Sequence, residues 1–177
     1  MNHPRLFLGA GISAMVLLLF TSQGSAQTAV PPAEAPLGKA ADNKIYAQQL
    51  VNDLLAANGD LLAVGFHALP PGGTEYMIVA HSRDLIGKKD SEADVEMIKN
   101  DQTIIGPETT GYTTTPRMVV HAALRDSAGR IVGLAVFSFK LETGTTKLAT
   151  HARAEAMLDG LARKIPNSAA LFNKSAP

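Results

Sequence analysis

The stretch RDSAGRIVGLAVFSF, residues 125–139, carries the most information about the fold. Its polar DSAG segment supplies turn-forming residues, and an apolar run with one glycine inside it follows. A turn of this kind between apolar runs is typical of a β-hairpin. We therefore predict strands over residues 117–124 and 131–141. Asp126 should cap its own turn, and Gly129 should take the left-handed conformation that glycine adopts easily.

Outward from this hairpin, apolar residues recur at three- and four-residue spacing in two long segments, residues 42–59 and 146–165, which predict amphipathic helices. Two further strands are predicted on either side of a Pro-Pro-Gly-Gly breaker, over residues 61–68 and 76–80. A short helix should begin after Ser91, where Asp94 three residues later completes a capping box. Residues 105–116, IGPETTGYTTTP, read as a turn-rich loop, and Lys88-Lys89-Asp90 as a solvated charged loop.

This order of elements predicts the fold class α+β. Strands joined mostly by short turns imply one antiparallel sheet, and the long N- and C-terminal helices should cover one face of it. The other face should be covered by the loop and short helix between His81 and Tyr112. A sheet face covered by an irregular loop is a common way to form a pocket.

The sequence divides into four segments. Residues 1–26 have one early positive charge, an apolar run and a small-residue end at Ala26, the pattern of a cleaved secretory signal peptide. Residues 27–38 are Pro/Ala-rich and predict a disordered linker. Residues 39–166 should form the folded domain, and residues 167–177 a flexible tail. We therefore expect a periplasmic or secreted protein.

Composition excludes several functions. The 177 residues contain no cysteine, which rules out disulfides, thiolate metal sites and cysteine nucleophiles. The formal net charge is zero, so no nucleic-acid partner is expected. No GxSxG, HxH, HExxH or phosphate-binding glycine pattern occurs. We expect a protein that is not an enzyme and has no cofactor and no metal site.

Two motifs carry a resemblance to a known family. LIGK at residues 85–88, and later LRDSAGRIVG at residues 124–133, resemble the extracytoplasmic Cache sensor domains, relatives of the PAS fold. The resemblance covers residues 39–164 and is to the single-module type, here as a stand-alone exported protein. It implies an antiparallel PAS/Cache-like sheet, a small-molecule ligand and signalling through a membrane receptor or kinase. The N-terminal helices of such domains often pair, which leaves a homodimer open.

The alternation of side chains along residues 117–124 suggests where a ligand would bind. Met118, Val120, Ala122 and Leu124 share one apolar face, which should pack on the helices. Arg117 and His121 share the other face, where an arginine fork could hold a carboxylate and an imidazole could add a donor or acceptor. We therefore predict an anionic metabolite as the ligand. The predicted ligand-binding residues are Arg117, His121, Tyr112, Thr114 and His81.

Two alternatives stay open. The same fold could be a structural or interaction protein with a filled pocket and no ligand. The scattered histidines could instead assemble a haem or metal site in three dimensions. A cavity lined by Arg117 and His121 would favour ligand binding, a solid core behind that face would favour the interaction protein, and converging histidines would favour the metal site.

Overall fold

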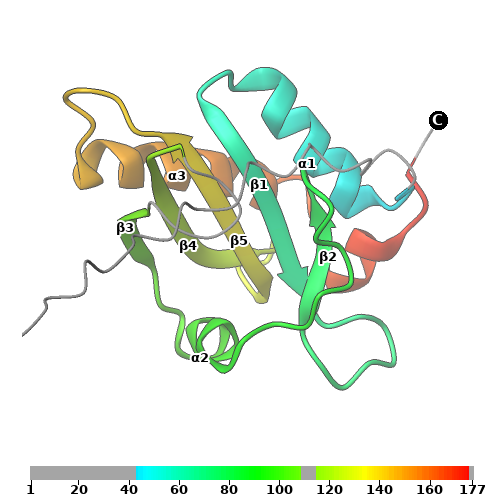
Figure 1. The fold of residues 1–177 in the computed structure, drawn as a ribbon. Helices are drawn as coiled ribbons and strands as arrows, with labels where there is room; N and C mark the ends of the chain where they lie inside the picture. Colours follow the sequence, from blue (N-terminus) through cyan, green and yellow to red (C-terminus); the bar gives the residue numbers. More distant parts are fainter. Residues whose placement is uncertain (1–42, 109–114, 176–177) are drawn as a thin grey trace, which may run out of the picture. The chain divides into compact units, whose positions relative to one another are not determined.

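A computed structural model describes residues 43–108 and 115–175 of the protein. The five strands form one sheet in the order β2-β1-β5-β4-β3, with every neighbouring pair antiparallel. Figure 1 shows this sheet with its helices. The elements in chain order are α1 (Tyr46–Ala57), β1 (Leu61–Ala68), β2 (Met77–His81), α2 (Glu92–Asn100), β3 (Ile104–Glu108), β4 (Arg117–Arg125), β5 (Ile131–Lys140), α3 (Lys147–Ala162) and the 3-10 helix η2 (Ser168–Phe172).

The β4–β5 hairpin forms as the sequence predicts. Its turn is held by Asp126, whose Oδ1 accepts the backbone N–H groups of Ala128 and Arg130 at 3.0 Å each. Gly129 has a φ of 79°, in the left-handed region that glycine tolerates. The predicted self-capped turn and its glycine are both confirmed.

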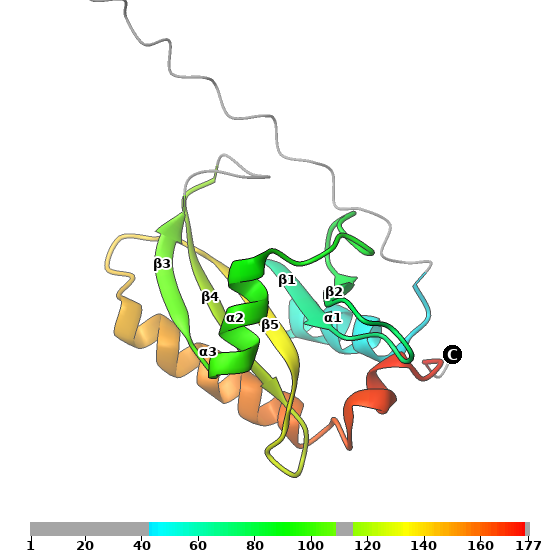
Figure 2. The ribbon, with the colours of Figure 1, turned by 90° about the horizontal axis from the view of Figure 1, so that it is seen from below.

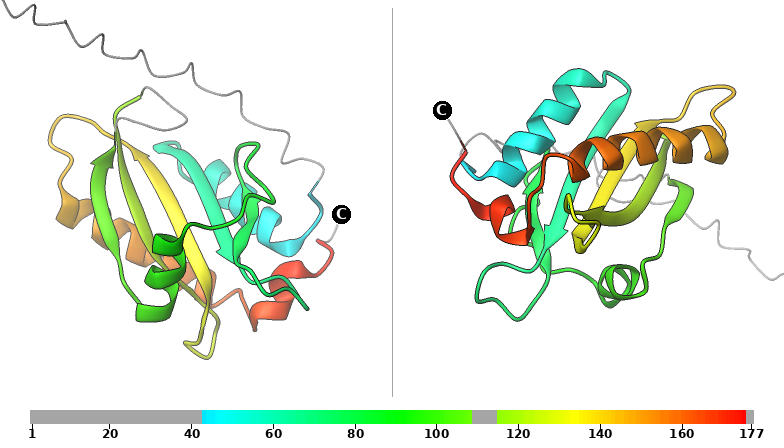
Figure 3. Two further views of the ribbon diagram at one scale, coloured as in Figure 1. Left: turned by 60° about the horizontal axis from the view of Figure 1, so that its bottom comes forward. Right: turned by 180° about the vertical axis from the view of Figure 1, so that it is seen from behind.

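Helices α1 and α3 cover one face of the sheet and α2 covers the other (Figures 2 and 3). The apolar side chains of β4 that alternate from Met118 to Leu124 lie in the main core with residues of α1 and α3, as their alternation predicts. A smaller cluster on the opposite face brings Met97 and Ile98 of α2 onto Leu134 of β5. The α+β class and the two-sided arrangement are therefore confirmed.

Helix α2 begins where the capping box predicts. Ser91 Oγ accepts the backbone N–H of Asp94, and Asp94 Oδ2 accepts the backbone N–H of Ser91, both at 3.2 Å. This reciprocal pair satisfies two donors that the first turn of a helix leaves unpaired. The capping box therefore fixes the residue at which α2 begins.

Two predictions differ from the structure. Residues 104–108 form the edge strand β3 rather than part of a turn-rich loop, and they pair with β4 along its length. Pro107 is compatible with this strand because an edge strand does not need every N–H for the ladder. The predicted flexible tail instead forms η2, in which Leu171 is fully buried, and Lys174 forms a bridge with Ile45.

The tail is held against the domain because Leu171 buries apolar area in the main core.

Within residues 43–108 and 115–175, no helix is long and apolar enough to cross a membrane. The predicted signal peptide and linker lie outside the described residues.

Candidate functional site

A pocket of about 310 Å³ lies on the α2 side of the sheet. It is bounded by residues of four strands, β1, β2, β4 and β5, and by the segment that runs from β2 into α2. Its size is at the lower end of the range for small-molecule sites. The lining residues are His67, Ile78, His81, Leu85, Lys88, Lys89, Asp90, Ser91, Asp94, His121 and Val136. We call it the histidine pocket, because β1, β2 and β4 each contribute one histidine.

His67 and Asp90 form a buried pair at this pocket. His67 Nδ1 lies 2.8 Å from Asp90 Oδ1, and the Asp90 side chain has no exposed surface. The pairing of β1 with β2 shifts between Phe66 and His67, and such a bulge re-aims the side chain beside it. The backbone of β5 approaches the backbone of His67 closely at Gly133. A Cβ on residue 133 would lie 2.0 Å from the His67 carbonyl oxygen, so only glycine fits there.

His81 contributes a neutral imidazole. Its Nδ1 accepts the backbone N–H of Arg83 at 2.8 Å, which places the proton of the neutral ring on Nε2. The pKa of His81 is lowered from 6.5 to about 4, chiefly because burial disfavours the charged imidazolium. His81 is therefore uncharged at neutral pH.

His121 is the third imidazole of the histidine pocket. Burial lowers its pKa below 6.5, although the carboxylates of Asp94 and Glu108 oppose this effect. Those carboxylates lie 3.8 Å from Nδ1 and 3.9 Å from Nε2, beyond hydrogen-bond distance. His121 is thus held in the neutral form between two acidic groups without a direct bond to either.

Two polar atoms at this pocket stand out. Asp90 Oδ2 and His121 Nδ1 are buried and have no hydrogen-bond partner among the described residues. Buried polar atoms in folded proteins are nearly always paired, and leaving one unpaired costs about 1–3 kcal/mol. Both residues line the histidine pocket, so a bound molecule or water that reaches these atoms would complete their bonding.

The cations of the histidine pocket lie near solvent. Lys88 and Lys89 are both exposed, and Lys89 Nζ forms an ion pair with Glu75. The sequence interpretation of a solvated charged loop holds for these two lysines. It is wrong for Asp90, which is 9% exposed, because the chain turns inward there to meet His67.

The structure brings together two of the predicted ligand-binding residues, His81 and His121. Arg117 is 1% exposed but does not line the histidine pocket, and its Nη2 donates to Glu108 Oε2 at 2.8 Å. Tyr112 and Thr114 lie outside the described residues. The pocket therefore contains His121 but not Arg117, so the predicted cavity lined by both residues is not found among the described residues.

Sequence reasoning missed His67 and Asp90. For His67 a usable pattern existed, because Val64, Phe66 and Ala68 pack in the main core and the alternation along β1 sends residue 67 to the other face. Asp90 had no such pattern, since it follows two lysines in a charged run. Only the tertiary contact with β1 identifies it.

No group of three or more His, Asp or Glu side chains within the described ranges could hold a metal ion. The three histidines line one pocket, but they do not converge on one point as metal ligands do.

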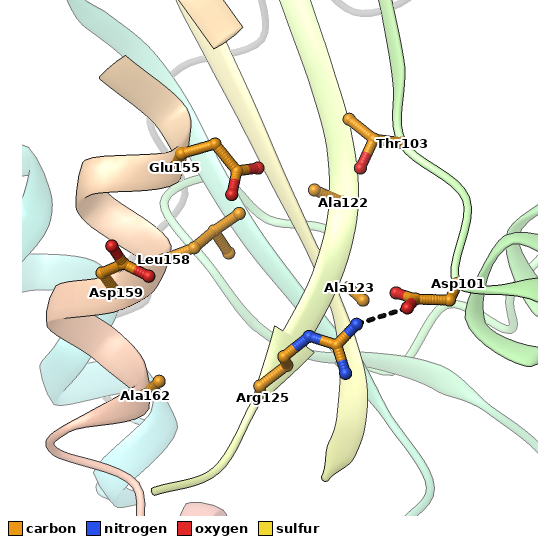
Figure 4. Close-up of a pocket in the computed structure, with 9 residues that line it drawn as sticks. All are labelled: Asp101, Thr103, Ala122, Ala123, Arg125, Glu155, Leu158, Asp159 and Ala162. Atoms are coloured by element: carbon orange, nitrogen blue, oxygen red, sulfur yellow. Dashed lines mark hydrogen bonds and ion pairs between the residues drawn. The ribbon is translucent and has the colours of Figure 1, made fainter. Parts of the chain in front are cut away.

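A second hollow of about 300 Å³ lies between α3 and β4 (Figure 4). Glu155 and Asp159 of α3 and Asp101 line it, together with Arg125, whose Nη2 donates to Asp101 Oδ2 at 2.5 Å. Glu155 and Asp159 are exposed. This hollow is acidic, but none of its polar side-chain atoms is buried and unpaired among the described residues.

No protein-family model and no curated protein sequence matches the chain. Solved structures do match its fold. A type II free methionine-R-sulfoxide reductase from Thermoplasma acidophilum superposes with a TM-score of 0.51 and 15% identity, covering 76% of this chain and 100% of that one. A protein assigned as a GAF sensor from Burkholderia vietnamiensis gives a TM-score of 0.53 and 12% identity, covering 77% of this chain and 83% of that one.

The chain has a GAF/PAS-like fold. The Cache resemblance agrees with this at the level of the fold, since Cache domains are relatives of PAS. Sequence identities of this size carry the fold alone, so the function must come from the residues of the site.

Proposed function

We propose that this protein is an exported small-molecule-binding domain of the sensor type, which holds its ligand in the histidine pocket. The observation that carries the proposal concerns Asp90 and His121, which both line one pocket of about 310 Å³. Asp90 Oδ2 and His121 Nδ1 are buried and have no hydrogen-bond partner in the described part of the chain. A concave site with a few converging polar groups is the usual form of a small-molecule site. A ligand that bonds to both atoms removes the cost of leaving them unpaired.

The role of the pocket is binding rather than catalysis. Ser91 is the only hydroxyl side chain lining it, and its Oγ donates to Asp94 Oδ2 at 2.7 Å while capping α2. A serine nucleophile needs instead a hydrogen bond to a base such as histidine.

Of the two solved structures described above, one is named as a sensor and the other as a reductase. The absence of cysteine from these 177 residues excludes a thiol-based reduction.

Export and signalling complete the proposal. The apolar run and small-residue end of residues 1–26 support secretion across a membrane. The LIGK motif and the hairpin motif support the Cache type among GAF/PAS-like folds. An exported sensor domain passes its signal by contact, so the proposed partner is a membrane receptor or kinase.

The predicted carboxylate ligand rested on Arg117. In the structure the guanidinium of Arg117 bonds to Glu108 and lies outside the wall of the pocket. The ligand class should therefore be judged from the residues that do line the pocket.

A thermal-shift screen of the purified protein tests the binding function. The library should contain organic acids, amino acids, amines, purines, divalent metals and haem. A ligand at 100 times its dissociation constant adds about 2.7 kcal/mol to the free energy of unfolding, a shift of a few degrees in a domain of this size. We expect such a shift from one chemical class.

Two variants assign that shift to the pocket. Leu85→Trp enlarges a half-buried residue that lines the pocket and should remove the response. Ile86→Trp makes the same change at the next residue, which is exposed and outside the lining, and should preserve the response. No shift from any class, with folded protein free of co-purified ligand, would overturn the proposal and favour an interaction protein. An equal response in both variants would place the ligand elsewhere.

A further inference from the structure

We infer that the histidine pocket takes a small organic cation of the primary ammonium or amidinium type, held by Asp90. The inference rests on the proposed binding function and adds the chemical class of the ligand. It reverses the charge of the ligand that the sequence alone predicts.

The carboxylate of Asp90 contributes a hydrogen-bond acceptor to the histidine pocket. Asp90 Oδ2 is an acceptor with no partner among the described residues, and His121 Nδ1 is a second buried polar atom without one. His67 Nδ1 lies 2.8 Å from Asp90 Oδ1, which leaves Oδ2 as the carboxylate oxygen available to a ligand. An N–H donor of the ligand matches the Asp90 carboxylate, whereas a ligand carboxylate would place acceptor against acceptor at this residue.

The depth of the charges favours the same class. The Asp90 side chain is fully buried, while Lys88 and Lys89 are exposed at the rim. A buried charge acts through a lower dielectric than an exposed one, and solvent screens the lysines. Lys89 is also paired with Glu75. The inner end of the pocket is therefore dominated by the negative charge of Asp90.

The acidic surroundings of His121 add to this effect. Asp94 and Glu108 lie within 4 Å of its two ring nitrogens, and neither carboxylate forms a hydrogen bond to the ring. A cation near His121 would interact favourably with both. A carboxylate in the same place would meet like charges, which costs affinity.

The acidic hollow of Figure 4 is the competing place for a cation. Its Glu155, Asp159 and Asp101 are all exposed, and Asp101 already forms an ion pair with Arg125. Exposed carboxylates hold a cation only weakly. The histidine pocket is therefore the stronger site, and a variant in each pocket can distinguish them.

The test compares charge-reversed probes of similar shape. Benzamidine and n-butylamine are titrated into the purified protein by calorimetry, beside benzoate and butyrate. We expect heat of binding from at least one cationic probe and none from its anionic counterpart. Binding of an anionic probe with loss of the cationic response would overturn the cation inference and leave the binding function standing. No heat of binding from any of the four probes, together with no shift in the thermal-shift screen, would overturn both the cation inference and the proposed binding function.

The variant Asp90→Asn sharpens the test. Its carbonyl oxygen can still accept from His67, but its amide presents a donor to the pocket where the carboxylate presents an acceptor. Loss of a hydrogen bond to a charged group should weaken binding of the cationic probe at least about tenfold. The matched change Asp159→Asn in the acidic hollow should leave affinity unchanged. The reverse pattern, with Asp159→Asn weakening binding, would overturn the assignment to the histidine pocket.

A spectroscopic readout covers the case in which Asp90→Asn fails to fold. The side-chain 15N resonances of His121 in the unsubstituted protein report on the bonding of its Nδ1. We expect the Nδ1 resonance to shift as benzamidine or n-butylamine is added. A saturating titration that leaves His121 unchanged while moving resonances on α3 would contradict the inference.

Discussion

The imidazole of His81 fills the space that a side chain at residue 65 would occupy. Gly65 and His81 are opposed in the antiparallel β1–β2 pair, and a Cβ on Gly65 would lie 2.5 Å from His81 Cδ2. The ring therefore packs against the bare backbone of β1. Glycine at this position sets how deeply His81 sits and so shapes one wall of the histidine pocket.

The change Gly65→Ala should displace His81. Real Cβ atoms essentially never approach another atom as closely as 2.5 Å, so the ring or the strand must move. Overpacking of this kind costs about 1–3 kcal/mol of unfolding free energy. Urea denaturation measures that loss, and ligand affinity should fall with it because the wall of the pocket moves.

Gly106→Ala in β3 is the matched control. A Cβ there has no heavy atom within 4 Å, and its φ is not in the left-handed region. Its stability should be unchanged or slightly raised, since alanine loses less backbone entropy on folding. Equal stability of the two variants would show that His81 adjusts without cost.

Much of the fold could be predicted because its elements have regular patterns. The period of α1, the alternation of β4 and the capping box of α2 each depend on local chemistry. The edge strand β3 was missed because Gly106-Pro107 reads locally as a turn, and only pairing with β4 makes it a strand. The tail was missed because Leu171 alone has no period, and its burial depends on a core built by distant residues.

The site was predicted only where strand alternation or a strand end marked it. Alternation placed His121 on the correct face, and the end of β2 placed His81 at the pocket. The same alternation put Arg117 beside His121, but the neighbouring strand supplies Glu108 directly opposite, and the arginine pairs with it. The sequence did not predict β3, so it could not predict that Glu108 of this strand pairs with Arg117. The contact of Asp90 with His67 also joins distant residues, and no local pattern predicts it.

Acid should destabilise the protein through His81. Its pKa is about 4 in the folded state and near 6.5 when unfolded, so between these values the unfolded chain binds the extra proton. The stabilisation is complete above pH 6.5 and is lost progressively as the pH falls to about 4. The loss should reach about 3 kcal/mol, and His121 acts in the same direction. Urea midpoints at pH 7.5, 6 and 4.5 measure it.

The variant His81→Gln should reduce the dependence of the unfolding free energy on pH. The measured quantity is the slope of this free energy against pH, so the result does not depend on how stable the variant is at any one pH. His151→Gln changes a half-exposed histidine on α3 and should keep the slope of the unsubstituted protein. A slope that survives His81→Gln unaltered would assign the acid sensitivity to other groups.

The capping box of α2 should contribute measurably to stability. Ser91→Ala removes the Oγ that accepts the Asp94 N–H, and loss of such a cap costs about 1 kcal/mol. The start of α2 would loosen, and with it the placement of Asp94 at the histidine pocket. Urea denaturation should show the loss, and amide hydrogen exchange should show it first in the N-terminal turn of α2.

Ser127→Ala is the matched control for Ser91. It lies exposed in the β4–β5 turn, where its backbone N–H donates to the Ile165 carbonyl and survives the change. Its stability should stay close to that of the unsubstituted protein. A similar loss in both variants would mean that the cap contributes nothing specific.

The carboxylate of Asp126 should stabilise the hairpin in a pH-dependent way. Burial of Asp126 raises its pKa, but hydrogen bonds from Arg130 and from the Ala128 N–H outweigh this, and the net shift is below 3.8. A carboxyl group with a lowered pKa stabilises the fold above its unfolded pKa and loses that contribution as the pH falls through the folded value. Asp126→Ala should therefore lower the melting temperature at pH 7. The difference from the unsubstituted protein should narrow below pH 3.8. The control variant Asp84→Ala changes an exposed loop residue and should alter the melting temperature at neither pH. An unchanged melting temperature for Asp126→Ala at pH 7 would show that the other turn residues and Gly129 suffice to form the hairpin.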